Sequence, residues 1–290
     1  MSTSLSALPV RRLTMRDLTA CADLTEDRDW AREEHRWSLL LAAGTAHGID
    51  DPDGKGLAAT CVVTSYGSSP HGGELTAVGM LLVAGRHARQ GLGQRLMNHV
   101  LHEAGTTPLV LHATPQGRPL YERLGFTGIG TTRTVLGRLR HPGPTAPPLA
   151  TRPATAADLP AIIRLDNEVF GADRTHLLAR LPAFADRLRV AEEGSTITGY
   201  GAAWPTPAAD VVGPLVARDT DTAKALVAAL APAADRPLRT AVDVRHTELL
   251  NWLEEHGLEP TALTTLMVHG VPGLPGDRTR LFAPLNLATG

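Results

Sequence analysis

The chain has 290 residues, 43% of them hydrophobic and 20% charged, and its formal net charge at pH 7 is −2. This length and composition suit a globular protein with room for two modest domains. The near-neutral net charge does not favour binding to nucleic acid or to an anionic membrane. A small molecule is therefore the expected partner. The two cysteines, Cys21 and Cys61, lie far apart, which suits a reducing compartment and defines neither a zinc site nor a disulfide framework.

The beginning of the chain lacks the basic and apolar stretches of a secretion signal, and nowhere do the roughly 18 apolar residues of a membrane span follow one another. We therefore expect a cytoplasmic protein. Among the 28 basic residues only Lys55 and Lys224 are lysines, an arginine bias typical of bacteria with GC-rich genomes.

The first half predicts an alternation of helices and strands. Helices are expected at 14–24 and 31–43, followed by a hairpin whose turn is 51–56. The apolar stretch 75–84 is typical of a central strand covered on both faces. Further elements are expected as a helix at 91–104, a strand at 109–113, a helix at 118–124 and closing strands to about residue 139. This order indicates an α/β (α+β) fold with a mixed central sheet flanked by helices.

Residues 141–150, His-Pro-Gly-Pro-Thr-Ala-Pro-Pro-Leu-Ala, divide the chain. Because prolines fix φ and remove backbone donors, we expect a linker here between a domain at 1–140 and another at 151–290. Landmarks of the first domain recur in the same order in the second: Arg11, Thr14 and Asp17 as Arg152, Thr155 and Asp158; the strand after Gly79 as the strand after Gly213; and 122–126 as 254–258. These echoes predict two copies of one unit.

The most informative segment joins the strand 75–84 to the helix 91–104. Gly91 and Gly93 stand where the helix begins, so free amide N–H groups and the positive end of the helix dipole can face an anion. Arg86 and Arg89 flank the turn and can add charge-assisted hydrogen bonds to phosphate. The spacing fits neither a dinucleotide fingerprint nor a P-loop. The turn alone is compatible with phosphate binding or with simple packing.

In its context this segment resembles motif A of the GNAT acyltransferases, Q/R-x-x-G-x-G/A, which cradles the pyrophosphate of coenzyme A. Ala88 stands at the Q/R position, with Arg89 beside it as a substitute. The resemblance implies that the strand pairs with the pantetheine arm, that an N–H polarises the thioester carbonyl, and that the loop binds the diphosphate of acetyl-CoA. The cofactor-binding residues so implied are Leu81, Leu82, Val83, Arg86, Arg89, Gln90, Gly91, Leu92 and Gly93.

Residues 117–126 resemble motif B of the same family, a helix that ends in Leu-Gly-Phe and carries a tyrosine four residues before its glycine. The resemblance implies that Tyr121 is the general acid that protonates the departing thiolate of coenzyme A. A phenol with a pKa of about 10 is protonated at neutral pH and can donate to a thiol with a pKa of about 8.5. The alternative interpretation is an aromatic side chain that only packs.

A base must also deprotonate the incoming ammonium group, and the sequence points to no single residue. Glu74, just before the central strand, is the first candidate, His71 is the second, and water can serve instead. The region 30–37, with Trp30 and Trp37, either shapes the acceptor pocket, as it does in this family, or forms a packed helix.

No metal site is expected. His99 and His102 lie on one helical face, but the sequence offers no third ligand near them, and the family that the chain resembles uses no metal.

The second copy differs from the first at the two positions to which the resemblance assigns a function, the glycine loop and the tyrosine. An acidic turn with Asp219 and Asp221 replaces the glycines and repels a diphosphate, and Leu253 stands where the first copy has Tyr121. The chain thus resembles tandem GNAT proteins with a regular amino-terminal domain and a divergent carboxy-terminal domain without cofactor. The divergent domain can close one side of the acceptor cleft, with Trp204 and Trp252 either lining it or packed in the core.

This resemblance implies an acetyl-CoA-dependent N-acetyltransferase in which a primary amine of a small molecule attacks the thioester directly, in a monomer or homodimer. The alternative is a catalytically silent acyl-CoA-binding or regulatory protein. A different acyl group or a hydroxyl acceptor also remains open.

Overall fold

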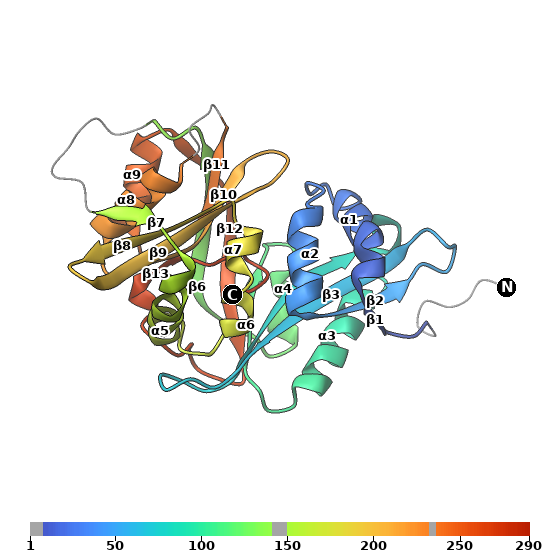
Figure 1. The fold of residues 1–290 in the computed structure, drawn as a ribbon. Coiled ribbons are helices and arrows are strands. Elements are labelled where there is room, and N and C mark those ends of the chain that lie inside the picture. The colour runs from blue at the N-terminus through green and yellow to red at the C-terminus, as the bar shows by residue number, and fades with distance from the viewer. Residues whose placement is uncertain (1–7, 141–149, 232–235) are drawn as a thin grey trace.

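The computed structural model describes residues 8–140, 150–231 and 236–290, and Figure 1 shows two halves side by side. The expected linker, 141–150, lies outside the described residues except for Ala150. In the described part of the chain, no helix is both long and apolar enough to cross a membrane.

The first half follows the predicted order closely. Its strands are β1 (Arg11–Leu13), β2 (Thr45–Asp50), β3 (Leu57–Tyr66), β4 (Leu75–Val83), β5 (Leu109–Ala113) and β6 (Thr127–Gly137). Its helices are α1 (Leu18–Glu26), α2 (Glu34–Ala43), α3 (Leu92–Ala104) and α4 (Arg118–Arg123), with short 3-10 turns η2 (Met15–Asp17) and η3 (Gly85–His87). The closing strands predicted up to residue 139 are a single strand, β6.

The second half repeats this order. Its strands are β7 (Thr151–Pro153), β8 (Arg187–Glu193), β9 (Thr196–Pro205), β10 (Asp210–Ala217), β11 (Leu238–Asp243), β12 (Leu258–His269) and β13 (Leu281–Ala283). Its helices are α5 (Leu159–Phe170), α6 (Thr175–Leu178), α7 (Leu181–Phe184), α8 (Thr220–Leu230) and α9 (Thr247–Glu255), with 3-10 turns η4 (Ala156–Asp158) and η5 (Arg278–Arg280).

The repeated motif at the start of each half has the same geometry in both. Thr14 and Asp17 form a capping box ahead of α1, and Arg11 pairs with that aspartate at 2.7 Å. In the second half Thr155 and Asp158 form the same box, and Arg152 pairs with Asp158 at 2.7 Å. Each box satisfies amide donors at a helix start, so the sequence echo reflects a repeated structure.

The two halves exchange strands across one continuous sheet. The strand order is β1-β2-β3-β4-β5-β12-β6-β11-β10-β9-β8-β7, with β13 paired to β10 off this path. Strand β12 of the second half lies between β5 and β6 of the first, and β6 lies between β12 and β11 of the second. Each half therefore contributes one strand to the part of the sheet formed by the other half.

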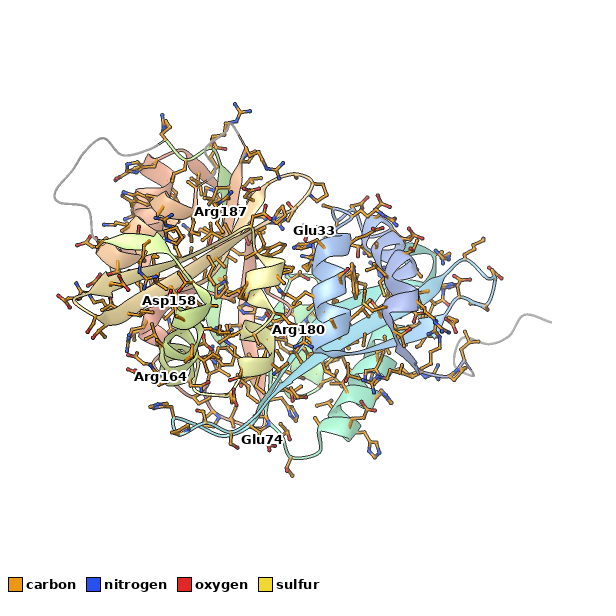
Figure 2. The ribbon with its side chains drawn as sticks, viewed as in Figure 1. Glu33, Glu74, Asp158, Arg164, Arg180 and Arg187 are labelled. Atoms are coloured by element: carbon orange, nitrogen blue, oxygen red, sulfur yellow. The ribbon has the colours of Figure 1, made fainter. Side chains whose placement is uncertain are left out.

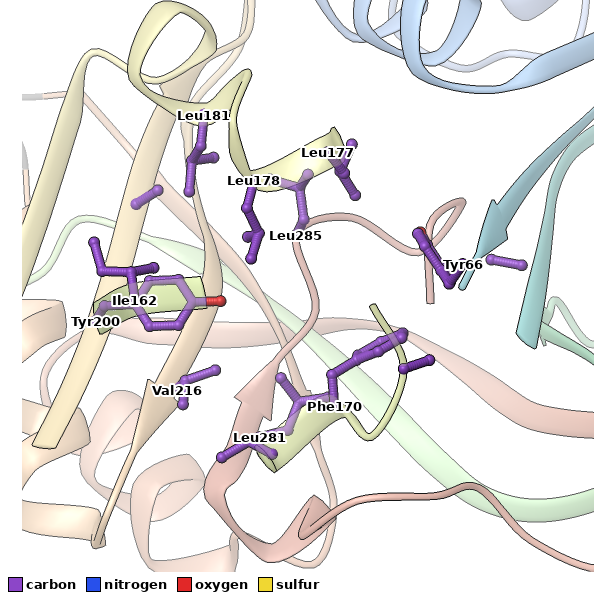
Figure 3. Packing of buried hydrophobic residues seen from close by; sticks show 14 of the residues in the cluster. Tyr66, Ile162, Phe170, Leu177, Leu178, Leu181, Tyr200, Val216, Leu281 and Leu285 are labelled. Carbon is purple, nitrogen blue, oxygen red and sulfur yellow. The ribbon is translucent and has the colours of Figure 1, made fainter. Parts of the chain in front are cut away.

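Helices cover both faces of the sheet. In the first half, α1 and α2 pack on one face and α3 and α4 on the other. A larger apolar cluster joins the halves, and Figure 3 shows Tyr66, at the end of β3, near Phe170 of α5. Their rings meet edge to face, with centroids 5.2 Å apart. Figure 2 shows Glu33 at the end of α2 that faces the second half, where it accepts a hydrogen bond of 2.9 Å from Arg239.

Candidate active site

Strands β4 and β5 separate beside the predicted cofactor loop. They pair in parallel only from Thr76 to Val78 of β4, opposite 109–111. Directly beyond, β4 bulges, and Met80 adopts a left-handed backbone conformation with φ 50°. Such strain in a non-glycine residue is typical of functional sites. Beyond Val78, β4 no longer pairs with β5, which leaves a gap between the two parallel strands at 79–83, and Ala288 packs on Gly79 at its start.

The amino end of α3 lies at this gap. Gly91 is its N-cap residue, with φ 83°, a conformation that glycine adopts without strain. Within the described residues, the amide N–H groups of Gly91, Leu92 and Gly93 donate to no protein acceptor. A Cβ added at Gly93 would lie 3.5 Å from Leu120 Cδ2 and 3.6 Å from Val83 Cγ2, which is ordinary contact. Packing within the protein therefore does not require glycine at position 93.

A buried carboxylate holds the loop before α3 in place. Asp51 accepts hydrogen bonds from Arg86 Nε at 2.6 Å and from His87 Nε2 at 2.9 Å. Although burial acts against it, hydrogen bonds from the Asp53 amide, His87 and Arg86 lower the pKa of Asp51 to about 2. Arg86 thus braces the loop. By contrast, Arg89 is exposed, has φ 60°, and forms no ion pair with any described residue.

Tyr121 lies on α4 and points into the core beneath α3. Only 9% of its surface is exposed, and its ring meets Phe126 at a centroid distance of 5.8 Å. Burial raises the pKa of the Tyr121 phenol, with a further contribution from Cys61 on β3. The hydroxyl bonds to no described residue. Tyr121 shares an apolar cluster with Cys61, which lies opposite the bulge of β4.

The structure does not bring Glu74 to this place. Glu74 is exposed and precedes β4, whereas the gap lies at the carboxyl end of that strand. Eight residues of extended strand separate it from Leu82, a span of roughly 26 Å. Figure 2 shows Glu74 at the opposite end of the first half from Glu33. Glu74 therefore lies at the other end of β4 from the cofactor loop, as does the exposed His71, and the assignment of Glu74 as the base stays a prediction.

A cavity of about 320 Å³ lies where strands of both halves meet. Its wall includes His112 of β5, Thr132 of β6, Asp243 of β11 and Arg278 of η5. Burial lowers the pKa of His112 to about 4, so this imidazole is neutral at pH 7. Sequence reasoning missed these residues because they come from four elements far apart in the chain; the only local signal was a histidine within the apolar strand 109–113.

Nη2 of Arg278 is fully enclosed and has no hydrogen-bond partner among the described residues. Burial and the neighbouring Arg174 lower the pKa of Arg278 to about 9. The tryptophans considered for this wall lie elsewhere: Trp37 and Trp204 are in the core, and Trp252 packs against His256.

The equivalent gap of the second half is filled by the chain itself. Strands β10 and β11 pair at only three positions, and β10 then bulges at Gly213. Beyond the bulge, β13 pairs with β10 at Leu215 and Val216. Asp219 caps α8 by accepting a hydrogen bond of 2.8 Å from the Thr222 amide, so a carboxylate stands where the first half has a bare glycine turn.

Separated parallel strands and a beta bulge precede a helix whose free amides can bind an anion. Two family models, each described as an acetyltransferase (GNAT) domain, match residues 62–141 and 162–283. The uncharacterized N-acetyltransferase YitH of Bacillus subtilis (strain 168) is 30% identical over 187 residues, which cover 64% of this chain and 66% of that protein.

Solved structures agree on the fold. A putative acetyltransferase from Pyrococcus horikoshii is similar with a TM-score of 0.80 at 16% identity, over 98% of this chain and 96% of that one. A tandem GNAT protein from the clavulanic acid biosynthesis pathway has a TM-score of 0.63 at 14% identity, over 92% and 99%. The chain belongs to the GNAT acetyltransferase family and carries two such domains in tandem.

Proposed function

We propose that the first half transfers an acetyl group from acetyl-CoA to a primary amine of a small molecule. The observation that carries this proposal is the set of free amides at Gly91, Leu92 and Gly93 beside the gap between β4 and β5. Amides at a helix start bind diphosphate through hydrogen bonds and the helix dipole. The open edge of Leu81 to Val83 can pair with the amide groups of a pantetheine arm, as a further strand would.

Each residue of the loop has a separate task in this proposal. Arg89, exposed and unpaired, supplies a cation for the phosphate oxygens, whereas Arg86 keeps the loop in shape through Asp51. Gln90 and Leu92 complete the turn, and Leu82 packs in the core behind it. The substitution of Ala88 for the family's Q/R removes a side-chain contact but none of the backbone donors.

Tyr121 is the general acid of the proposed reaction. The amine nitrogen bonds to the thioester carbon, the carbon–sulfur bond breaks, and the phenolic proton of Tyr121 passes to the sulfur. Burial raises the pKa of the phenol, so Tyr121 is protonated at neutral pH and has a proton to donate, although the same shift makes it a weaker acid. The amine's own proton leaves to water, since no described carboxylate of the loop is free to take it and His112 is a weak base.

We further infer that the unit spanning 151–290 binds no cofactor. It instead contributes residues to the acceptor pocket of the unit spanning 1–140. The support is that β13 pairs along β10 where a pantetheine would otherwise lie. The cavity lined by His112 and Arg278 is the proposed acceptor pocket, because His112 directly follows the last paired residue of β5 and so borders the gap. A cavity of this size suits a small molecule.

Replacing Gly93 with alanine tests the diphosphate cradle. Because the new methyl group meets only ordinary contacts and alanine favours a helix over glycine by about 1 kcal/mol, we expect unfolding to be unaffected or slightly harder. Because the methyl group lies beside Leu81 and Val83, on the strand proposed to hold the cofactor, we expect calorimetry to show coenzyme A bound at least about tenfold more weakly, a loss of about 1.4 kcal/mol.

Gly73→Ala is the matched control, since a Cβ there meets nothing within 4 Å and the site is distant. Unchanged affinity in Gly93→Ala would show that the cradle is elsewhere.

A further inference from the structure

Three potential metal ligands converge between α3 and β2. His99 and Glu103 are four residues apart on that helix, and the fold brings His47 of β2 against them. One ligand atom from each residue lies within 4.8 Å of the others. The sequence suggested His99 with His102 and found no third ligand; in the structure His102 is exposed and takes no part, and the missing partners are Glu103 and a residue 52 positions earlier.

The distances match those between neighbouring ligands of a tetrahedral ion. Nε2 of His99 lies 3.3 Å from Oε1 of Glu103, and Nε2 of His47 lies 3.0 Å from Oε2 of the same carboxylate. Metal–nitrogen bonds of about 2.0–2.1 Å in a tetrahedron place adjacent ligand atoms roughly 3.3–3.5 Å apart. The two imidazole rings stand at 74° to each other, with centroids 4.7 Å apart.

Hydrogen bonding accounts for only part of this convergence, because Nε2 of His99 and Nδ1 of His47 share a hydrogen bond of 3.2 Å. The other ring nitrogen of His47, Nε2, is buried near Oε2 of Glu103 but has no hydrogen-bond partner among the described residues. Only 4% of His47 is exposed, and a buried polar atom without a partner is costly.

We propose that His47, His99 and Glu103 bind a divalent transition-metal ion, with zinc the best match. Two imidazoles and one carboxylate suit Zn²⁺ better than Mg²⁺ or Ca²⁺, which prefer oxygen ligands. Water supplies the fourth ligand, because Glu103 and His99 are partly exposed, with 48% and 32% of their side-chain surfaces open to solvent. The ion joins α3 to β2 and so steadies the helix whose amino end faces the proposed diphosphate site.

Titration of the full chain with Zn²⁺ and Co²⁺, after removal of any affinity tag and of bound metal, tests this site without reference to enzyme activity. We expect one ion per chain, a higher melting temperature with Zn²⁺, and the visible absorption of tetrahedral Co²⁺. His99→Ala and Glu103→Gln alter partly exposed side chains on a helix surface and should fold. Loss of a direct ligand should weaken binding by at least about 10- to 100-fold.

His102→Ala is the matched control on the same helix and should bind as the wild type does. The proposal is overturned if the wild-type chain binds neither ion, or if binding survives unchanged in both His99→Ala and Glu103→Gln. Loss of binding in His102→Ala together with retention in His99→Ala would likewise place the ion elsewhere.

Discussion

Tyr121→Phe is expected to lower kcat by about 100- to 10,000-fold, the usual contribution of general acid catalysis. The substitution removes one hydroxyl from a side chain that otherwise packs against Phe126. Because that hydroxyl bonds to no described residue, folding and the affinity for acetyl-CoA should change little. Steady-state kinetics with a reactive amine, paired with calorimetry for acetyl-CoA, separates the effect on the chemical step from any effect on binding.

Glu122→Gln is the control for this experiment. Glu122 follows Tyr121 on α4 and pairs with Arg118 at the surface, with 48% of its side chain exposed, so its loss should leave kcat unchanged. If Tyr121→Phe turns over as fast as the wild type, the phenol is not the acid. If neither protein releases thiol with any amine, the chain is an acyl-CoA-binding protein without transferase activity.

Asp166→Ala is expected to lower the free energy of unfolding by about 3–5 kcal/mol, the cost of leaving a buried charge unpaired. Asp166 and Arg174 are fully buried and form two hydrogen bonds of 2.7 Å. Tyr200 donates a further bond to Asp166, and the guanidinium stacks 4.0 Å above the Phe170 ring. Chemical denaturation measures the loss.

Two further variants distinguish the effect of an unpaired buried charge on stability from the effect of losing any ion pair. The double variant Asp166→Leu with Arg174→Met removes both charges and should recover much of the stability, because apolar residues can replace a buried ion pair. Glu248→Gln breaks an exposed contact with Lys224 and should leave unfolding nearly unchanged. Equal losses from Asp166→Ala and Glu248→Gln would contradict the burial argument.

Much of the first half could be predicted from local sequence. The strand 109–113 coincides with β5, and the helix expected from Gly91 begins one residue later, because Gly91 is its cap. The recurrence of Arg11, Thr14 and Asp17 as Arg152, Thr155 and Asp158 predicted a duplication, and the two capping boxes confirm it. These features depend on neighbours within a few residues, which is why a sequence pattern suffices for them.

The exchange of β6 and β12 could not be predicted in this way. Both strands are long and antiparallel to their neighbours, and nothing in their residue pattern says which half supplies the partner. The filling of the second gap by β13 is likewise a contact between distant segments. The separation of Glu74 from the cofactor loop could not be predicted for a related reason: proximity in sequence to β4 did not reveal which end of that strand faces the loop.

The measurement that tests the account most directly is the binding of coenzyme A to the full chain, by calorimetry and in a crystal of the complex. One molecule per chain should bind, with its diphosphate at the amides of Gly91 to Gly93 and with β13 undisturbed along β10. Absence of binding at saturating coenzyme A, or a diphosphate at the start of α8 instead of α3, would contradict the account.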